Sequence, residues 1–177
     1  MADFTSKEIK RTFLRLLEER SYSEITVKEL IDECGISRST FYYHFQDIPS
    51  LMEEIVQDGM NEILRKYPTV DSLDRCLDAL TEMVLSRRRI NLHVFRSANR
   101  ETLERSMLRA CELFVTRYAD TLTGEHALPE RARALMVQHY KCLLFGMLVD
   151  WLENGLKPEK AADYCDILRE SGKQLFR

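Results

Sequence analysis

Glycine and proline are scarce in this chain of 177 residues, which contains only 6 of the first and 4 of the second. A β-sandwich or a β-barrel needs many tight turns that use these residues, so their scarcity favours long helices and an all-α fold. The longest apolar run, residues 143–149, is far shorter than the roughly 18 residues of a membrane span. The first residues do not have the pattern of a signal peptide. We therefore expect a soluble all-α protein.

An excess of basic charge is also missing. The 26 Lys and Arg residues and the 29 Asp and Glu residues give a formal net charge of −3, which excludes a polybasic tail or a cationic coat for nucleic acid. Any binding of a polyanion must therefore be local.

Metal, redox and catalytic motifs are absent from the sequence. The five cysteines are odd in number and widely spaced, which suits a reducing compartment better than a disulfide framework. His139 and Cys142 lie one helical turn apart, but a single turn with two ligands does not make a metal site. A Gly-rich phosphate loop and a nucleophile elbow are missing as well. We expect no metal, no cofactor and no enzymatic activity.

Start and stop signals divide the chain into about nine helices. Thr5–Glu8 and Thr26–Glu29 have the pattern of capping boxes, Gly35 follows the second helix, Ser37 can cap the third, and Asp47 precedes the fourth. The expected helices span residues 6–20, 27–34, 38–45, 48–67, 72–86, 91–97, 100–122, 129–153 and 158–174. No repeat or flexible linker separates them, so we expect the two halves of the chain to pack together.

Residues 26–45 have the pattern of a helix-turn-helix motif, in which two short helices meet at a tight Gly turn. Phe41 and Phe45 share one face of the second helix and are expected to be buried. Their expected core partners are Leu30, Ile31 and Ile36. The opposite face is polar or amphipathic and fits the DNA major groove. The same spacing also fits an ordinary helical hairpin with an aromatic core.

The expected DNA contacts come from the start of the first helix of the motif and from the outward side of the second. These residues are Thr26, Lys28, Ser37, Arg38, Ser39, Thr40, Tyr42, Tyr43 and His44. Arg38 can donate two hydrogen bonds to a guanine edge, whereas the hydroxyls of Thr40 and Tyr42 and the His44 imidazole can bond phosphate oxygens.

The acidic side chains near this motif must be kept away from DNA if the interpretation holds. Residues 1–50 carry seven basic and nine acidic side chains. Three of the acidic ones, Glu29, Asp32 and Glu33, lie in the first helix of the motif. We expect them to lie mostly away from the phosphates, with Lys28 facing the phosphates.

The motif is similar to a known family signature. The matching residues are Ile25–Leu30, Cys34–Asp47 and Leu51, and they include Thr-Phe-Tyr-Tyr-His-Phe at 40–45. They closely resemble the N-terminal signature of the smaller TetR-family transcriptional regulators. The resemblance implies a cytoplasmic bacterial homodimer on a pseudo-palindromic operator, usually an effector-responsive repressor and sometimes an activator. It implies a DNA-binding head, residues 1–47, and a helical body, residues 48–177, that binds an effector and dimerises through its last two helices.

One position departs from the family pattern. The family usually has a Lys three residues after the Phe of His-Phe, where it meets a phosphate, and this chain has Ile48. That contact is lost or replaced. Together with the acidic head, Ile48 supports an alternative interpretation, a helical adaptor that no longer binds DNA.

The body contains candidates for a dimer interface and for an effector site. A helix that is apolar over more than half its circumference needs a second surface to cover it, and Gly146 allows close approach of another backbone. The expected interface residues are Tyr140, Leu143, Gly146, Met147, Trp151, Tyr164 and Leu168. The expected effector contacts are His93, Tyr118, His139 and Cys142, although each is also typical of a structural residue.

Overall fold

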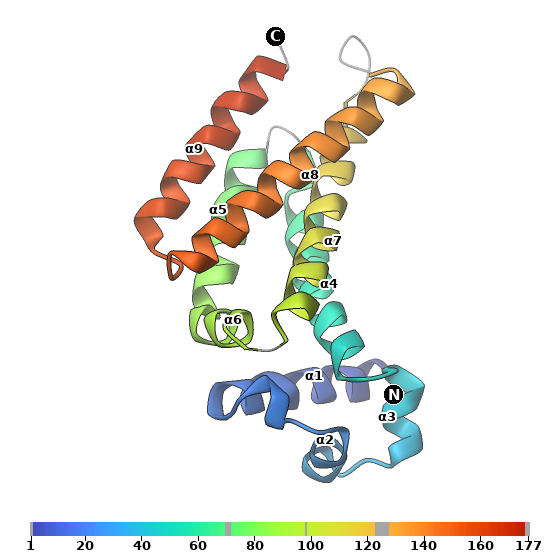
Figure 1. Ribbon diagram of the computed structural model, residues 1–177. Helices are drawn as coiled ribbons and strands as arrows, with labels where there is room; N and C mark the ends of the chain where they lie inside the picture. The colour runs from blue at the N-terminus through green and yellow to red at the C-terminus, as the bar shows by residue number, and fades with distance from the viewer. Residues whose placement is uncertain (1, 70–71, 98, 123–127, 176–177) are drawn as a thin grey trace. The chain divides into compact units, whose positions relative to one another are not determined.

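The computed structural model describes residues 2–69, 72–97, 99–122 and 128–175, and these form an all-α protein (Figure 1). Within this part of the chain there are nine α-helices and no strand, which confirms the predicted fold class. The helices are α1 (Ala2–Glu19), α2 (Val27–Cys34), α3 (Arg38–His44), α4 (Ile48–Lys66), α5 (Leu73–Ser86), α6 (Arg88–Phe95), α7 (Arg100–Ala119), α8 (Glu130–Glu153) and α9 (Pro158–Leu175). A 3-10 turn, η1, spans Tyr22–Glu24. None of the described helices is both long and apolar enough to cross a membrane.

The chain divides into two compact units. Unit 1 consists of Met1–Val56 and Arg89–Ser106, and unit 2 consists of Gln57–Arg88 and Met107–Arg177. The helices α4, α6 and α7 each begin in one unit and continue into the other. The predicted division into a head, 1–47, and a body, 48–177, concerns function and stays a prediction.

The predicted caps of α2 and α3 are present. The Thr26 hydroxyl accepts a hydrogen bond from the Glu29 N–H at 3.2 Å, and the Ser37 hydroxyl accepts one from the Thr40 N–H at 3.0 Å. Gly35 ends α2 with φ +63°, a left-handed conformation that costs glycine little. These local signals set the bounds of α2 as predicted and those of α3 to within one residue.

Two other helices begin earlier than the sequence predicted. The helix α1 begins at Ala2, so the predicted box Thr5–Glu8 lies inside it, and the Glu8 carboxylate bonds Arg11 instead. The helix α6 begins at Arg88 rather than at residue 91, and Arg87 alone separates it from α5. Arginine has high helix propensity, so Arg88 and Arg89 belong to α6 and the break between the two helices is confined to Arg87.

The core of unit 1 contains the aromatic pair of the predicted motif. Phe41 is 0 % exposed and Phe45 2 %, and Leu30 is buried beside them as predicted. Ile31 and Ile36, which we expected in this core, are only half-buried. The reason is the turn: the Ile36 N–H donates to the Ile31 carbonyl at 3.1 Å, a bond of the Schellman motif that places both side chains at the end of α2.

The Tyr22 hydroxyl in unit 1 predicts an effect on stability. Tyr22 is 5 % exposed and packs edge-on against Phe13, but its hydroxyl bonds no described group. Burial, with a smaller contribution from Asp47, raises its pKa from 10 to about 12. We expect Tyr22→Phe to be neutral or stabilising by up to about 1 kcal/mol at pH 7 because it removes an unsatisfied group.

The raised pKa of Tyr22 also predicts that the effect of Tyr22→Phe on stability depends on pH. Because burial penalises the ionised phenolate in the folded state, the folded protein loses stability as the pH rises from 10 towards 12. At pH 11 this lowers the free energy of unfolding by about 1.4 kcal/mol. Tyr22→Phe has no phenol at this position, so its stability should not fall in this way. Urea unfolding of both proteins at pH 7 and pH 11 measures the difference. A pH-independent difference would contradict the assignment.

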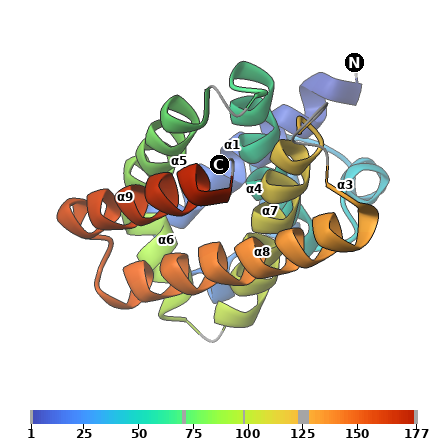
Figure 2. The same cartoon turned by 90° about the horizontal axis from the view of Figure 1, so that it is seen from above.

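In unit 2, α9 lies beside α5 and near α8, as the two views show (Figures 1 and 2). Arg169 on α9 bonds Asp74 at 3.0 Å and Asp78 at 3.1 Å, both on α5. The turn between α8 and α9 is held by Arg88, whose guanidinium donates to the Gly155 carbonyl at 3.0 and 2.7 Å. These contacts fix the α8–α9 hairpin within unit 2.

Candidate nucleic-acid interface

The helix α3 buries one side and exposes the other. Phe41 is buried, whereas Tyr42 is 50 % and Tyr43 77 % exposed. Arg38 and Ser39 are exposed as well, and Thr40 and His44 are half-buried. We call these six outward residues, Arg38, Ser39, Thr40, Tyr42, Tyr43 and His44, the outward arc. Two adjacent exposed aromatic side chains form a surface patch, so the arc is a candidate binding surface.

In the first turn of α3 the Ser37 hydroxyl bonds two other hydroxyls. The Ser37 oxygen lies 2.8 Å from the Ser39 oxygen and 2.7 Å from the Thr40 hydroxyl oxygen. Ser37 also accepts the Thr40 N–H. Each hydroxyl can both donate and accept, so the cluster retains capacity for a phosphate oxygen. The small side chains leave room for a backbone to approach the positive end of the helix.

Ring contacts orient the aromatic side chains of the outward arc. The His44 ring lies edge-on to Tyr43 with centroids 5.1 Å apart, and tilted against Phe45 at 6.1 Å. Tyr42 lies edge-on to the buried Phe41 at 5.5 Å. Tyr42 and His44 of the arc therefore contact aromatic rings in the core of unit 1.

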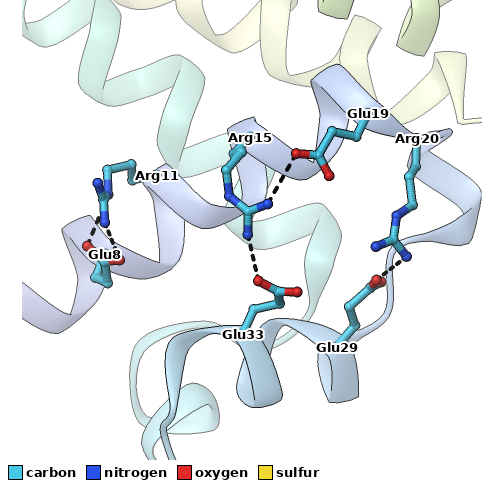
Figure 3. A network of polar contacts seen from close by, with 7 residues as sticks. All are labelled: Glu8, Arg11, Arg15, Glu19, Arg20, Glu29 and Glu33. Carbon is cyan, nitrogen blue, oxygen red and sulfur yellow. Dashed lines mark hydrogen bonds and ion pairs between the residues drawn. The ribbon is translucent and has the colours of Figure 1, made fainter.

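Among the described residues of α1 to α3, Lys28 and Arg38 are the basic side chains without an ion pair or a side-chain hydrogen bond. Both are exposed. Three arginines of α1 and the following turn are paired with carboxylates (Figure 3); these are Arg11, Arg15 and Arg20. The two unpaired cations are thus those that the sequence analysis assigned to DNA.

Arginines also pair two of the three acidic side chains of α2. Arg15 donates to Glu33 at 2.7 Å, and Arg20 contacts Glu29 (Figure 3). The hydrogen bond that Arg15 donates to Glu33 is the main reason that the pKa of Arg15 is raised. Sequence reasoning missed both arginines, because the partners lie 18 and 9 residues apart and no local pattern joins them.

Position 48 belongs to the core. Ile48 is 9 % exposed, so its side chain offers nothing to a phosphate. The start of α4 is capped instead by Asp47, whose carboxylate accepts the Ser50 N–H at 2.7 Å, while the Asp47 N–H donates to the Ser50 hydroxyl at 3.0 Å. The contact that the family makes with a lysine at this point has no basic counterpart in Asp47, Ile48 or Ser50.

The four predicted effector residues are divided between the two units. His93 lies in unit 1, and the other three lie in unit 2. His93, His139 and Cys142 are exposed. Tyr118 is buried, its hydroxyl donates to the Tyr67 carbonyl at 2.8 Å, and burial raises its pKa. Of the four residues Tyr118 is the buried one, and their contact with an effector stays a prediction.

The predicted dimer residues divide into exposed and buried ones. Gly146 is exposed, and a Cβ atom built on it meets nothing within 4 Å. Tyr140, Leu143, Met147, Tyr164 and Leu168 are half-buried. Trp151, in contrast, is 5 % exposed and donates its indole N–H to the Lys157 carbonyl at 2.8 Å. It packs inside unit 2 and is not available to a partner surface.

An all-α chain whose helix-turn-helix presents an open polar face has the architecture of a DNA-binding regulator. Residues 12–55 match the family model described as bacterial regulatory proteins, tetR family, and residues 71–170 match the model of a transcriptional regulator C-terminal region. The chain belongs to the TetR family of transcriptional regulators. It is a transcription factor and not an enzyme, as predicted.

Two proteins of Bacillus subtilis (strain 168) are similar in sequence to part of the chain. The HTH-type transcriptional regulator YxbF is 32% identical over 66 residues, which are 37% of this chain and 17% of that protein. The HTH-type transcriptional regulator YerO is 35% identical over 46 residues, which are 26% of this chain and 16% of that protein. The matches thus cover about a sixth of these relatives' own length.

Solved structures share the fold over nearly the whole chain. The dihydroxyacetone kinase operon activator DhaS aligns with a TM-score of 0.69 at 17% identity, covering 97% of this chain and 96% of DhaS. NalD of Pseudomonas aeruginosa, the secondary repressor of the MexAB-OprM multidrug efflux pump, aligns with a TM-score of 0.59 at 18% identity, covering 100% of this chain and 97% of NalD. At these identities the likeness shows the fold alone.

Proposed function

We propose that the protein is a homodimeric repressor that binds a pseudo-palindromic operator in the cytoplasm and responds to an effector. The observation that carries the proposal is the outward arc of α3, where Arg38 is exposed and without a partner among the described residues. DhaS is named an activator and NalD a repressor, so both roles occur on this fold. We favour repression because it requires only that the operator be occupied.

The proposed dimer is formed by α8 and α9. Only Trp151 and Leu152 are buried among the 24 residues of α8, although this helix is rich in apolar side chains. Leu135 on α8 is 63 % exposed and Ile167 on α9 48 %. A second copy of the same hairpin would cover these side chains, as an isologous two-fold interface does. The two α3 helices would then meet half-sites about 34–36 Å apart, or a multiple of that spacing.

The proposed effector acts through α4. This helix begins directly after α3 and continues from unit 1 into unit 2, so a ligand that displaces α4 also displaces α3. Of the predicted effector residues, Tyr118 is the buried one and remains the candidate in unit 2. An effector can change operator affinity only by its differential affinity for the two states, with coupling of about 1–3 kcal/mol. Operator DNA must then change effector affinity by the same factor.

A gel-shift titration with the DNA upstream of its own gene tests the function directly. We expect saturable binding that a competitor of unrelated sequence does not displace. If this fragment fails, a pool of random duplexes selected over several rounds replaces it. Absence of binding in both experiments would favour the alternative of a helical adaptor. The buried Ile48 and the acidic head support that alternative.

Two side chains of the outward arc are expected to bind phosphate and not a base. We expect Tyr42→Phe and His44→Ala each to weaken binding by about fivefold, the equivalent of one hydrogen bond of about 1 kcal/mol. The loss should be equal for operator and unrelated DNA, because phosphate contacts carry no sequence information. Fluorescence anisotropy with both duplexes measures it. A loss confined to the operator would assign these side chains to base recognition.

A further inference from the structure

The starts of η1 and α2 in unit 1 each have a glutamate three residues after the cap, but the two carboxylates contact different partners. At η1, the Ser21 N–H donates to the Glu24 carboxylate at 3.1 Å, which is the return contact of a capping box. At α2, Thr26 and Glu29 have the same spacing, but only half of the box is formed: the Thr26 hydroxyl accepts the Glu29 N–H at 3.2 Å. The Glu29 carboxylate does not return to the Thr26 N–H. It contacts Arg20 instead (Figure 3).

The position of this carboxylate matters because of what surrounds the start of α2. Thr26 and Lys28 are exposed, and Lys28 has no partner among the described residues. The free N–H groups and the dipole of a helix start attract phosphate. A carboxylate that completed the box would occupy the Thr26 N–H and place a negative charge at this point. Like charge at that distance repels phosphate.

Arg20 is placed to prevent this. It follows the last residue of α1, and in Figure 3 its side chain extends to the Glu29 side chain on α2. The Glu29 side chain is 20% exposed and the Arg20 side chain 44%. Arg15 bonds Glu33 in the same way at the other end of α2.

From these contacts we infer that Arg20 is a positioning residue for DNA binding. It holds the Glu29 carboxylate away from the N-terminus of α2 and neutralises it, so that the start of α2 stays open to a phosphate. The inference rests on the proposed function, since it concerns the affinity of this surface for DNA.

Four proteins test the inference by fluorescence anisotropy with operator DNA at low salt. We expect Arg20→Ala to bind about two- to fivefold more weakly, the effect of one charge at a helix start. The double variant Arg20→Ala/Glu29→Gln should recover the affinity of the unmodified protein. Arg11→Ala is the matched control: it removes the same charge from α1, but the released carboxylate, Glu8, lies on α1 itself. Its affinity should change less than that of Arg20→Ala.

An independent measurement follows the carboxylate without DNA. In Arg20→Ala, Glu29 is free to accept the Thr26 N–H, so amide exchange of Thr26 should slow relative to the unmodified protein. Circular dichroism checks that each variant is folded, which we expect because exposed ion pairs contribute little stability. If Arg20→Ala is unfolded, Glu29→Gln alone replaces it and should bind DNA at least as tightly as the unmodified protein.

The outcomes separate this inference from the proposed function. If the unmodified protein binds no DNA, the proposed function fails, and Thr26 exchange still tests whether Arg20 diverts Glu29. If it binds and Arg20→Ala equals Arg11→Ala, the positioning role is overturned. A double variant as weak as Arg20→Ala also overturns it, because Arg20 would then act on DNA or on the fold directly. An unchanged rate of Thr26 amide exchange in Arg20→Ala also overturns the positioning role.

Discussion

Replacing Gly146 with glutamate is expected to convert the proposed dimer into folded monomers that no longer bind the operator. The position is exposed, and a Cβ atom built there meets nothing within 4 Å, so a single chain accommodates the new side chain. In the proposed dimer the same carboxylate is buried against α8 or α9 of the second copy, together with its symmetry mate. An unpaired buried charge costs several kcal/mol, which is enough to shift association by orders of magnitude.

Sedimentation velocity measures the change, with Gly146→Ala as the matched control. Alanine adds one methyl group and no charge, and it favours a helix over glycine. We expect Gly146→Ala to remain dimeric and Gly146→Glu to sediment as a monomer with unchanged helical content. An intact dimer of Gly146→Glu would show that Gly146 does not lie in the interface and would move the proposed interface elsewhere.

Loss of operator binding follows from the symmetry of the site. A dimer places two α3 helices on two half-sites, so the second contact is made at high effective concentration. A monomer has only one such helix and makes half the contacts. Gel-shift titration of Gly146→Glu should therefore show weak binding with no preference for two half-sites over one.

The parts of the fold that the sequence predicted well are those set by short-range chemistry. The bounds of α2 and α3 follow from Thr26, Gly35 and Ser37, each of which acts on a backbone group within a few residues. The burial of Phe41 and Phe45 follows from helical spacing. The outward arc is what remains once that inward face is assigned.

The parts that the sequence did not predict depend on distant partners. Arg20 pairs with Glu29, so the capping box at α2 is only half formed, and nothing in Thr26–Glu29 indicates this. Trp151 lies on an apolar helix like its neighbours, but the turn after α8 brings the Lys157 carbonyl to its indole N–H. Both features arise where separate segments meet, and a pattern within one helix does not contain that information.

Arg38→Ala is expected to lower operator affinity by about 1–3 kcal/mol, which is about 5- to 150-fold, and to relax the preference at one base position. Arg38 is the first residue of α3, is exposed, and bonds no other described side chain, so its guanidinium is available to a guanine edge. Anisotropy with operators that carry each base at each position measures the preference.

Lys28→Ala is the matched control, since it also removes one unpaired exposed cation from the motif. If Lys28 contacts phosphate, its removal should weaken binding to all DNA sequences alike and reduce the salt slope of binding by about 1. If Arg38→Ala instead weakens every sequence equally, as Lys28→Ala should, Arg38 contacts the backbone, and base recognition must come from other residues of the outward arc.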